Sequence, residues 1–262
     1  AAEARERVLS LLRDLGHEAV VLGPEATPHG AVETREDARC CADLFRANQD
    51  RIEGILVVLP NFGDEVGVVE AIAGARLDVP VMVQACDDHP ERTDLANRRD
   101  AFCGKISVCS NLRQAGIRFT DTTFHTCAIG SEAMVRDLDF FARVCRVVNG
   151  LRRARIGAVG ARPDPFRTVR FSEKLLQASG ITTCVVDLSE ILAAASRIPD
   201  DAALAERVRA IRGYGRLADD VVPETILRQA RLGLAVEAWL DRQGCDASAI
   251  QCWSSVQENH GC

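Results

Sequence analysis

One stretch, Arg98 to Gln114 (RRDAFCGKISVCSNLRQ), combines a basic pair, a carboxylate, a Cys-Gly-Lys turn and an Asn-x-x-Gln pair. Such a density of polar groups is typical of a binding site. Ile106 and Val108 alternate with polar neighbours, which predicts a short strand within the stretch. No pair of its side chains supplies the carboxylates for proton transfer or the ligands of a metal centre. We therefore predict that it forms a scaffold and a wall that faces a partner.

Two acidic loops follow apolar runs that have the pattern of strands. The first, residues 61–65, places two carboxylates at the carboxyl end of the expected sheet, where open α/β folds hold their ligands. These carboxylates either bind a sugar or cation or cap the next helix, and both interpretations stay open. The second loop contains Asp-Asp-His at 87–89, which are metal-ligand types. Adjacent loop residues rarely converge on one ion, so we favour a turn held by Asx hydrogen bonds and Pro90.

Arg162 follows an expected strand and precedes an expected helix, a position at which an anion or a sugar hydroxyl can bind. With Arg167 and Arg170 it either holds an acidic substituent or simply belongs to an exposed helix, where arginines are common. The Gly-x-x-Gly before it is too short for the dinucleotide fingerprint, so we exclude a Rossmann NAD site. We interpret His125 as a hydrogen-bonded structural residue rather than a ligand or base.

Composition limits the class of protein. With 262 residues, 47% of them hydrophobic, the chain can bury the core of one large α/β domain or the cores of two medium-sized ones. The formal charge of -6, with basic and acidic residues interspersed, argues against a nucleic-acid surface. No apolar run approaches the roughly 20 residues that span a bilayer, and the N-terminal residues predict a charged amphipathic helix rather than a signal peptide. We expect a cytoplasmic protein without nucleic-acid or membrane partners.

The chain has 11 cysteines but no Cys-x-x-Cys motif. Most lie in apolar or strand-like settings, as Cys145, Cys184 and Cys252 do, where cysteine acts as a small hydrophobe. We predict buried, reduced thiols rather than a zinc or redox centre.

Hydrophobic periodicity predicts a first α/β domain over residues 1–150. Its expected elements are helix 1–15, strand 17–22, a helix capped by Thr34 and running to Asn48, strand 55–59, helix 66–75, strand 79–85, a short strand at 117–119 and a long helix 131–149 closed by Gly150. A βαβ chain normally begins with a strand. We therefore expect that the leading strand is missing from this sequence.

A second α/β domain is predicted over residues 151–262. Its expected elements are strand 155–160, helix 168–179, strand 181–187, helix 187–195, helix 202–212 with a break at 213–215, helix 223–243 and strand 247–252. We expect no helix to cover the last strand, which would leave this domain incomplete at its C-terminus. The fold class that follows is α/β, with two Rossmann-like three-layer domains built on mainly parallel sheets.

Five segments in order, LPNFGDE, RRDAFCGKISVCSNLRQ, ARIGAVGARPDPFRTVRFSEKLL, VDLSEI and QCWSSVQ, resemble the L-fucose and L-arabinose isomerase family, particularly its fucose-isomerase-like members. The resemblance covers nearly all of the chain. It implies an aldose–ketose isomerase of three domains, assembled as a trimer or hexamer with active sites between subunits. It also implies Mn²⁺ or another divalent metal as cofactor, with proton transfer through an ene-diol. A 1,2-hydride shift stays open.

The resemblance also suggests roles for particular residues. The family's metal-binding Glu, Asp and His follow the QCW motif, so the catalytic residues are expected beyond Cys262 and none is assigned here. Gln251 and Trp253 match the family position beside the substrate. The other substrate-binding candidates are Arg162 and, from the first domain across a subunit interface, Lys105, Asn111 and Gln114.

Two further questions stay open. Glu258 and His260 are weak metal candidates, because the family ligands lie further on and two residues do not complete a coordination sphere. The chain is either the N-terminal portion of a sugar isomerase or a non-catalytic sugar-binding or assembly module. The sequence does not identify the sugar.

Overall fold

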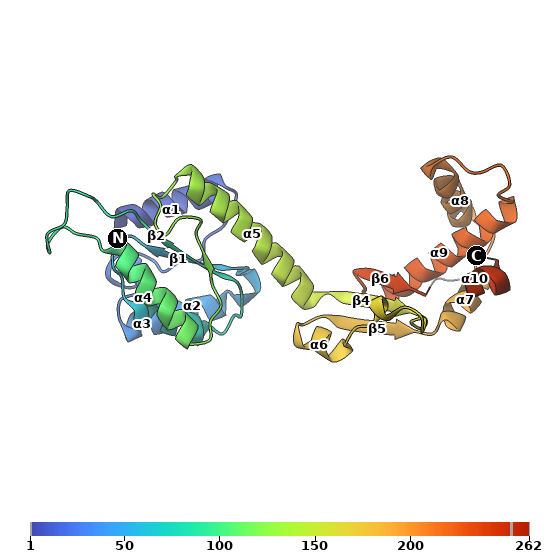
Figure 1. The fold of residues 1–262 in the computed structure, drawn as a ribbon, viewed down its shortest axis with the longest axis horizontal. Coiled ribbons are helices and arrows are strands. Elements are labelled where there is room, and N and C mark those ends of the chain that lie inside the picture. The colour runs from blue at the N-terminus through green and yellow to red at the C-terminus, as the bar shows by residue number, and fades with distance from the viewer. Residues whose placement is uncertain (1, 252–253, 262) are drawn as a thin grey trace. The chain divides into compact units, whose positions relative to one another are not determined.

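The computed structural model describes residues 2–251 and 254–261. The chain divides into two compact units, Ala1–Asn149 and Gly150–Cys262. This division falls one residue before the boundary expected from the sequence. Each unit contains one three-stranded parallel sheet, and Figure 1 labels the elements of both.

The first unit has strand order β1-β2-β3. Its elements are α1 (Ala2–Asp14), the 3-10 turn Pro28–Gly30, α2 (Arg35–Ala47), the 3-10 turn Gln49–Arg51, β1 (Ile55–Leu59), α3 (Glu65–Ala75), β2 (Val81–Ala85), α4 (Ala101–Gln114), β3 (Thr120–Asp121) and the start of α5 (Glu132–Arg153). β1 pairs with β2 from Ile55 opposite Val81 to Leu59 opposite Ala85. The short β3 pairs with β2 beside Met82 and Val83.

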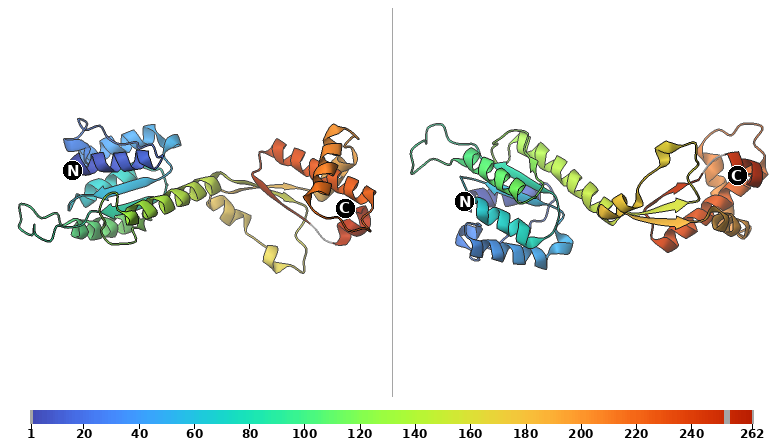
Figure 2. Two further views of the ribbon diagram at one scale, coloured as in Figure 1. Left: turned by 90° about the horizontal axis from the view of Figure 1, so that it is seen from above. Right: turned by 60° about the horizontal axis from the view of Figure 1, so that its bottom comes forward.

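Apolar side chains cover both faces of sheet β1-β2-β3. Ile55, Val57 and Leu59 pack with residues of α3 and α4. Leu56 and Val58 point to the opposite face and pack with residues of α1 and α5. Because both faces of β1 are covered, the uninterrupted run ILVVL is the pattern expected of it. The first unit therefore has the helix–sheet–helix layers of an α/β domain, and Figure 2 shows its strands from two further directions.

The second unit has strand order β5-β4-β6. Its elements are β4 (Arg155–Val159), the 3-10 turn Arg167–Val169, α6 (Glu173–Ala178), β5 (Thr182–Val186), α7 (Leu188–Ser196), α8 (Ala202–Tyr214), α9 (Pro223–Gln243), β6 (Ala247–Ile250) and α10 (Ser254–His260). Its core joins β4 and β5 to α7 and α9. A Cβ at Gly157 would lie 2.7 Å from side-chain atoms of Trp239 and Leu240, so glycine lets α9 approach β4 closely.

Several predicted helix starts are confirmed by their capping bonds. Thr34 and Asp37 form a reciprocal capping box at the start of α2. Asp64 accepts a hydrogen bond of 2.6 Å from the amide of Gly67 at the start of α3. Asp187 caps α7. Gly244 ends α9 in the left-handed conformation at φ 60°, as predicted for a helix C-terminus.

The strand predicted around Ile106 and Val108 is wrong, because residues 101–114 form helix α4. The alternation at 106–109 is outweighed by a longer helical repeat of buried positions: Ala101, Gly104, Lys105, Val108 and Leu112. This repeat lines one face of the helix and packs it against the sheet.

Two other predicted strands of the first unit differ from the structure. Residues 17–23 contain no strand, and Leu22 is instead buried against α2 and α3 in a small cluster with Ala38 and Cys41. The strand expected at 117–119 lies at Thr120–Asp121, because Ile117 and Phe119 pack onto the core below the end of α4.

Most other differences between the predicted and the observed elements lie in where helices begin and end. α5 continues through Gly150 to Arg153, since this glycine keeps a helical backbone. The helix expected at 168–179 is reduced to a 3-10 turn and the six-residue α6, which begins after the cap Ser172. α8 extends through Gly213 to Tyr214.

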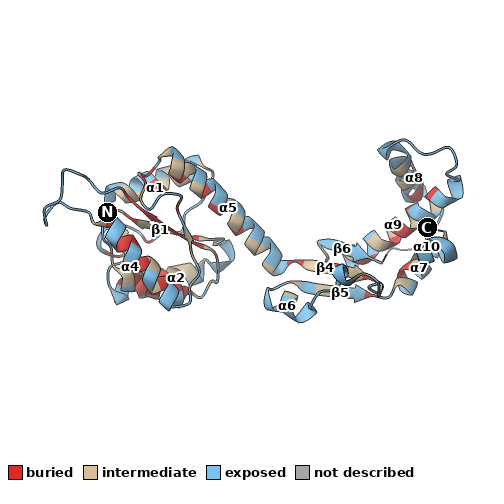
Figure 3. Cartoon of the chain, viewed as in Figure 1, coloured by how far each residue is buried: buried red, intermediate tan, exposed pale blue. Residues whose placement is uncertain are grey.

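The C-terminal end also departs from expectation. β6 ends at Ile250, whereas the strand was predicted to reach Cys252, which lies outside the described residues. Residues 254–260 form helix α10, which was not predicted, and its Val256 is buried. The predicted α/β fold class with parallel sheets is confirmed. Figure 3 shows that burial is concentrated where helices meet the sheets, whereas α6 is largely exposed. Within the part of the chain that the structure describes, no helix is long and apolar enough to cross a membrane.

Candidate functional site

Helix α4 begins at the carboxyl edge of sheet β1-β2-β3, and two contacts fix its position there. Asp88 caps it from the preceding loop, since its carboxylate accepts bonds from the amides of Ala101, at 2.9 Å, and Phe102, at 3.4 Å. Gly104 lies directly on the 61–63 loop, where a Cβ would come within 1.8 Å of the Phe62 carbonyl oxygen. The two acidic loops therefore act at this edge as helix caps and a packing surface.

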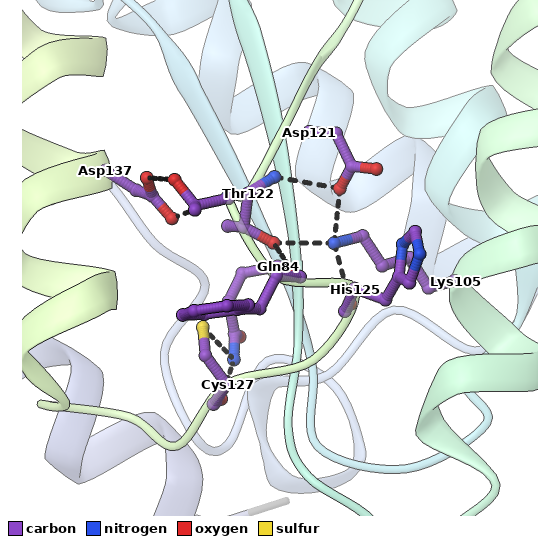
Figure 4. A network of polar contacts seen from close by, with 9 residues as sticks. Gln84, Lys105, Asp121, Thr122, His125, Cys127 and Asp137 are labelled. Carbon is purple, nitrogen blue, oxygen red and sulfur yellow. Dashed lines mark hydrogen bonds and ion pairs between the residues drawn. The ribbon is translucent and has the colours of Figure 1, made fainter.

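Lys105 projects from α4 into a polar network, shown in Figure 4, whose buried polar and charged members are Lys105, Thr122 and Gln84. Its side chain is only 4% exposed. The ammonium forms an ion pair with Asp121 and donates to Thr122 Oγ1 at 2.7 Å and to the His125 carbonyl at 2.9 Å. An ammonium has three N–H donors, so these three oxygens match its capacity.

The same network fixes the loop that follows β3. The Thr122 hydroxyl donates to the Phe124 carbonyl at 2.7 Å. Thr123 binds the Asp137 carboxylate of α5 through its amide at 2.9 Å and its hydroxyl at 2.6 Å. The loop is thus tied to α4 on one side and to α5 on the other (Figure 4).

Gln84 extends this arrangement into the sheet. It is fully buried in β2, and its Nε2 donates to the Cys127 carbonyl at 2.8 Å. Its Oε1 has no hydrogen-bond partner in the described part of the chain. The bond from Gln84 thus anchors the loop after β3 to the sheet as far as Cys127.

The exposed side of this edge is aromatic and polar. The rings of Phe102 and His125 are 5.3 Å apart and tilted by 33°. Phe62, Phe102 and Phe124 keep between 40% and 57% of their surface exposed. The Asp121 side chain is 48% exposed. The edge can thus offer ring faces and a carboxylate to a ligand, whereas the Lys105 ammonium is occupied internally. His125 is hydrogen-bonded through its backbone carbonyl, and its ring is exposed.

The other two candidates of the first unit do not join Lys105. Asn111 and Gln114 lie further along α4, and Gln114 is about 13 Å from Lys105 along the helix axis at the usual rise per residue. Asn111 is half-buried. Gln114 is exposed, and its Nε2 donates to Ser110 Oγ at 3.2 Å. These residues line α4 and do not converge with Lys105 on one point.

In the second unit, Gln251 follows β6 and reaches the turn after β4. Its Oε1 accepts a bond of 2.7 Å from the Ala161 amide. Gly160 in this turn has φ 79°, and a Cβ there would lie 2.6 Å from Gln251 Oε1. Position 160 therefore requires glycine for two reasons: its φ is positive, and the Gln251 side chain occupies the space of a Cβ. The structure brings Gln251 beside the residue that precedes Arg162.

Arg162 lies in this turn region at the carboxyl edge of sheet β5-β4-β6. Its guanidinium stacks 4.4 Å above the Phe171 ring and lies 3.7 Å from the Glu173 carboxylate. Arg170 lies 3.6 Å from Asp164. Both arginines thus have acidic neighbours and remain partly exposed. Trp253 lies outside the described residues.

The weak metal candidates do not form a centre in the described residues. Glu258 and His260 are exposed on α10, and residues two apart on a helix point in different directions. Asp64 and Asp88 serve as helix caps. Across residues 2–251 and 254–261, no group of three or more His, Cys, Asp or Glu side chains could hold a metal ion.

The cysteines that the structure describes are all unpaired thiols. Burial raises the pKa of Cys41 and that of Cys145 to about 11, which keeps both protonated at neutral pH. Burial also raises the pKa values of Cys86 and Cys127. These four cysteines are therefore buried, as predicted, whereas Cys109, Cys184 and Cys245 are only half-buried. Cys40 and Cys103 are instead exposed, and Cys252 lies outside the described residues.

Sequence reasoning missed most partners of Lys105. Residues 120–123 form a polar run, TDTT, directly after an apolar segment, and Gln84 interrupts the apolar strand VMVQA. Both signals are visible in the sequence. Their connection to Lys105 and Asp137 is not, because it depends on how α4 and α5 flank the strand.

Comparison with known proteins identifies the family of the first unit. A search of curated proteins finds no match to the chain. The sequence profile of the fucose/sulfoquinovose isomerase N-terminal domain matches residues 1–152. That range contains the whole of sheet β1-β2-β3 together with α4 and its network. The chain therefore belongs to the fucose/sulfoquinovose isomerase family.

Proposed function

We propose that this chain takes part in the interconversion of an aldose and a ketose. The observation that carries the proposal is the family match over residues 1–152, which points to a sugar isomerase. The carboxyl edges of both parallel sheets support it, since ligands of open α/β folds bind at such edges. The reaction moves hydrogen between C1 and C2 of the sugar, either as a proton through an ene-diol or as a hydride.

In this proposal the second unit offers hydrogen-bonding groups to sugar hydroxyls. The Gln251 Oε1 accepts from the Ala161 amide and its Nε2 carries two N–H donors, while Arg162 has partly exposed donors. Trp253 follows Gln251 in sequence and would add a ring face for the sugar.

The first unit would contribute a wall to a site on another copy of the chain. Asn111 and Gln114 can contact the sugar or the neighbouring copy directly. Lys105 acts through the loop that its ammonium holds, because that group is only 4% exposed. A homo-oligomer, as a trimer or hexamer, is part of this proposal, and sedimentation of the purified chain measures it.

A divalent metal such as Mn²⁺ is the proposed cofactor, and it would polarise the sugar oxygens when bound. The described residues do not fit a metal site, because they supply no cluster of three ligands. We therefore assign no step of the reaction to a metal-bound group here. We further propose a cytoplasmic location, in keeping with the unpaired state of the described cysteines.

The lack of a ligand cluster in the described residues favours a second candidate, a non-catalytic sugar-binding or assembly module. One experiment separates the two. A panel of aldoses, including 6-deoxy and sulfonated hexoses, is incubated with the chain with and without Mn²⁺. Ketose formation is followed by NMR, and binding is followed by calorimetry. Mn²⁺-dependent turnover supports the isomerase, whereas binding without turnover supports the module. The absence of both binding and turnover would contradict both candidates.

Paired variants locate the sugar. Gln251→Ala is expected to weaken sugar binding by about tenfold, the effect of one lost hydrogen bond to a polar ligand. Gln177→Ala, at an exposed position of α6, is the matched control and should bind as the unchanged protein does. Equal affinity of both variants would remove Gln251 from the site.

A further inference from the structure

Helix α5 carries two apolar stripes, and the core of the first unit uses one of them. The buried stripe consists of Met134, Leu138, Phe141 and Cys145. The exposed stripe lies about 100° away round the helix and consists of Phe140, Val144, Val147 and Leu151. Three of its members, Phe140, Val147 and Leu151, keep more than half of their surface exposed, and Val144 is half-buried. The exposed stripe is therefore an apolar helix face that the solvent reaches.

The spacing of the exposed stripe is that of a seam between two helices. Its members follow one another by four, three and four residues. Alternation of three and four residues is the pattern by which the side chains of two packed helices interdigitate. Single exposed apolar residues are normal on a protein surface, but a regular row of four on one helix predicts a second helix against it.

The charges of α5 indicate which helix fits. Residues 132–139 contain three carboxylates and one arginine, whereas residues 140–153 contain four arginines and no carboxylate. A parallel copy of α5 would place acidic beside acidic and basic beside basic. An antiparallel copy places the acidic part of each helix along the basic part of the other, and such complementarity favours the correct partner and orientation.

The register of an antiparallel pair follows from the same spacing, because four, three and four reads the same in both directions. A two-fold axis between positions 145 and 146 places Phe140 of one copy opposite Leu151 of the other. It also places Val144 opposite Val147, so each member of the exposed stripe meets another member. Asp139 and Arg153, both exposed on the flank away from the buried stripe, then approach each other from the two copies.

We propose that the exposed stripe is a self-complementary interface at which two copies of the chain pack their α5 helices antiparallel. The proposal rests on the homo-oligomer of the proposed function and names a two-fold contact within it. A two-fold contact uses the same surface patch on both copies. A dimer, or a hexamer built from two trimers, contains such an axis, whereas a simple trimer does not.

Sedimentation of the full chain tests the interface. Val147→Asp places two carboxylates in the middle of the seam and should halve the measured mass. Leu175→Asp, at an exposed apolar position of α6, is the matched control and should keep the mass of the unchanged protein. Circular dichroism of both variants verifies that they are folded. A monomeric unchanged chain, or a folded Val147→Asp variant of full mass, would overturn the proposal.

Charge reversal tests the antiparallel register. Asp139→Arg alone and Arg153→Asp alone each bring like charges together across the axis and should weaken association by about tenfold. The double variant should associate as the unchanged protein does. The two single variants should also pair with each other when mixed, and native mass spectrometry identifies these mixed pairs because the variants differ in mass. Failure of the double variant to recover association would overturn the register, since a parallel pair offers no such rescue.

Sugar binding and turnover, measured on the same proteins, separate this proposal from the proposed function. Turnover of a sugar by a chain whose mass is unaffected by Val147→Asp would overturn the interface and leave the reaction standing. Association with the predicted responses to Val147→Asp and to charge reversal would support the interface even if no sugar is bound.

Discussion

Lys105 and Lys174 are the two lysines of the chain, and their surroundings are opposite. Lys105 is buried and paired with Asp121, whereas Lys174 lies exposed on α6. Burying an ammonium is unfavourable unless its donors are satisfied. The contacts with Asp121, Thr122 and His125 meet that condition, so removal of the cation leaves several polar groups without their partner.

Lys105→Met should therefore lower the free energy of unfolding by about 2–3 kcal/mol. The expected loss of stability is not larger, because Asp121 is half-exposed and water can replace part of the lost contact. Urea denaturation followed by circular dichroism measures the change. Lys174→Met is the matched control and should stay within about 0.5 kcal/mol of the unchanged protein; an equal loss in both variants would contradict the role of the network.

The capping box of α2 gives a dependence on pH. The pKa of Asp37 is lowered chiefly by its hydrogen bond from the Thr34 amide. A depressed carboxyl pKa stabilises the fold above the unfolded pKa of about 4, and the stabilisation is lost as pH falls through the lower folded value. Asp37→Asn should thus reduce the melting temperature at pH 7, and the difference from the unchanged protein should shrink below about pH 4. The exposed control Asp50→Asn should show little difference at either pH.

At the scale of elements, α4 shows how close packing determines position. Gly104 allows the helix to lie on the Phe62 carbonyl, and the buried face 101–112 then fills the space beside β1 and β2. Gly150 in α5 differs, because a Cβ there would meet nothing within 4 Å. Gly104 and Gly150 should therefore respond oppositely to substitution by alanine.

Gly104→Ala is expected to destabilise the first unit by about 2–4 kcal/mol, because a backbone oxygen rather than a flexible side chain blocks the new methyl group. Gly150→Ala should stabilise the protein by about 0.5–1 kcal/mol, since alanine restricts the unfolded chain and favours helix. Thermal unfolding of both variants measures the difference. A destabilised Gly150→Ala, or an unchanged Gly104→Ala, would contradict the packing described.

The sequence predicted those elements whose signals are local. A pattern of a few residues is enough to predict the strand at 55–59, the helix start at Thr34, and the start at Pro223 and end at Gly244 of the last long helix. α4 was misread because Ile106 and Val108 suggest alternation, whereas its helical face emerges only over 12 residues, 101–112, and includes Gly and Lys. Gln251 could be placed at a sheet edge, but its bond to Ala161 depends on register between distant strands.

At the scale of the whole molecule, the two units have separate cores. The buried members of the core clusters run from residue 8 to residue 145 in the first unit and from residue 159 to residue 239 in the second. A domain with its own core can fold alone. The family profile covers residues 1–152, which is nearly the extent of the first unit.

A fragment of residues 1–153, which keeps α5 to its end, should therefore unfold cooperatively by itself. Its helical circular dichroism and its protected amides in hydrogen exchange are the measurements. Leu138→Ala within α5 is a useful comparison, because it removes a buried side chain and should cost the fragment and the full chain a similar amount, about 2–4 kcal/mol. A fragment without a cooperative transition would contradict independent folding.

The close contact of Trp239 with Gly157 has a spectroscopic consequence. The chain contains two tryptophans, Trp239 and Trp253, and both belong to the second unit. Trp239 is buried against β4, so opening of the core formed by α7, α9 and sheet β5-β4-β6 exposes its indole to water. Fluorescence excited selectively at tryptophan therefore observes the second unit, whereas the first unit contributes no indole emission and must be followed by its helices.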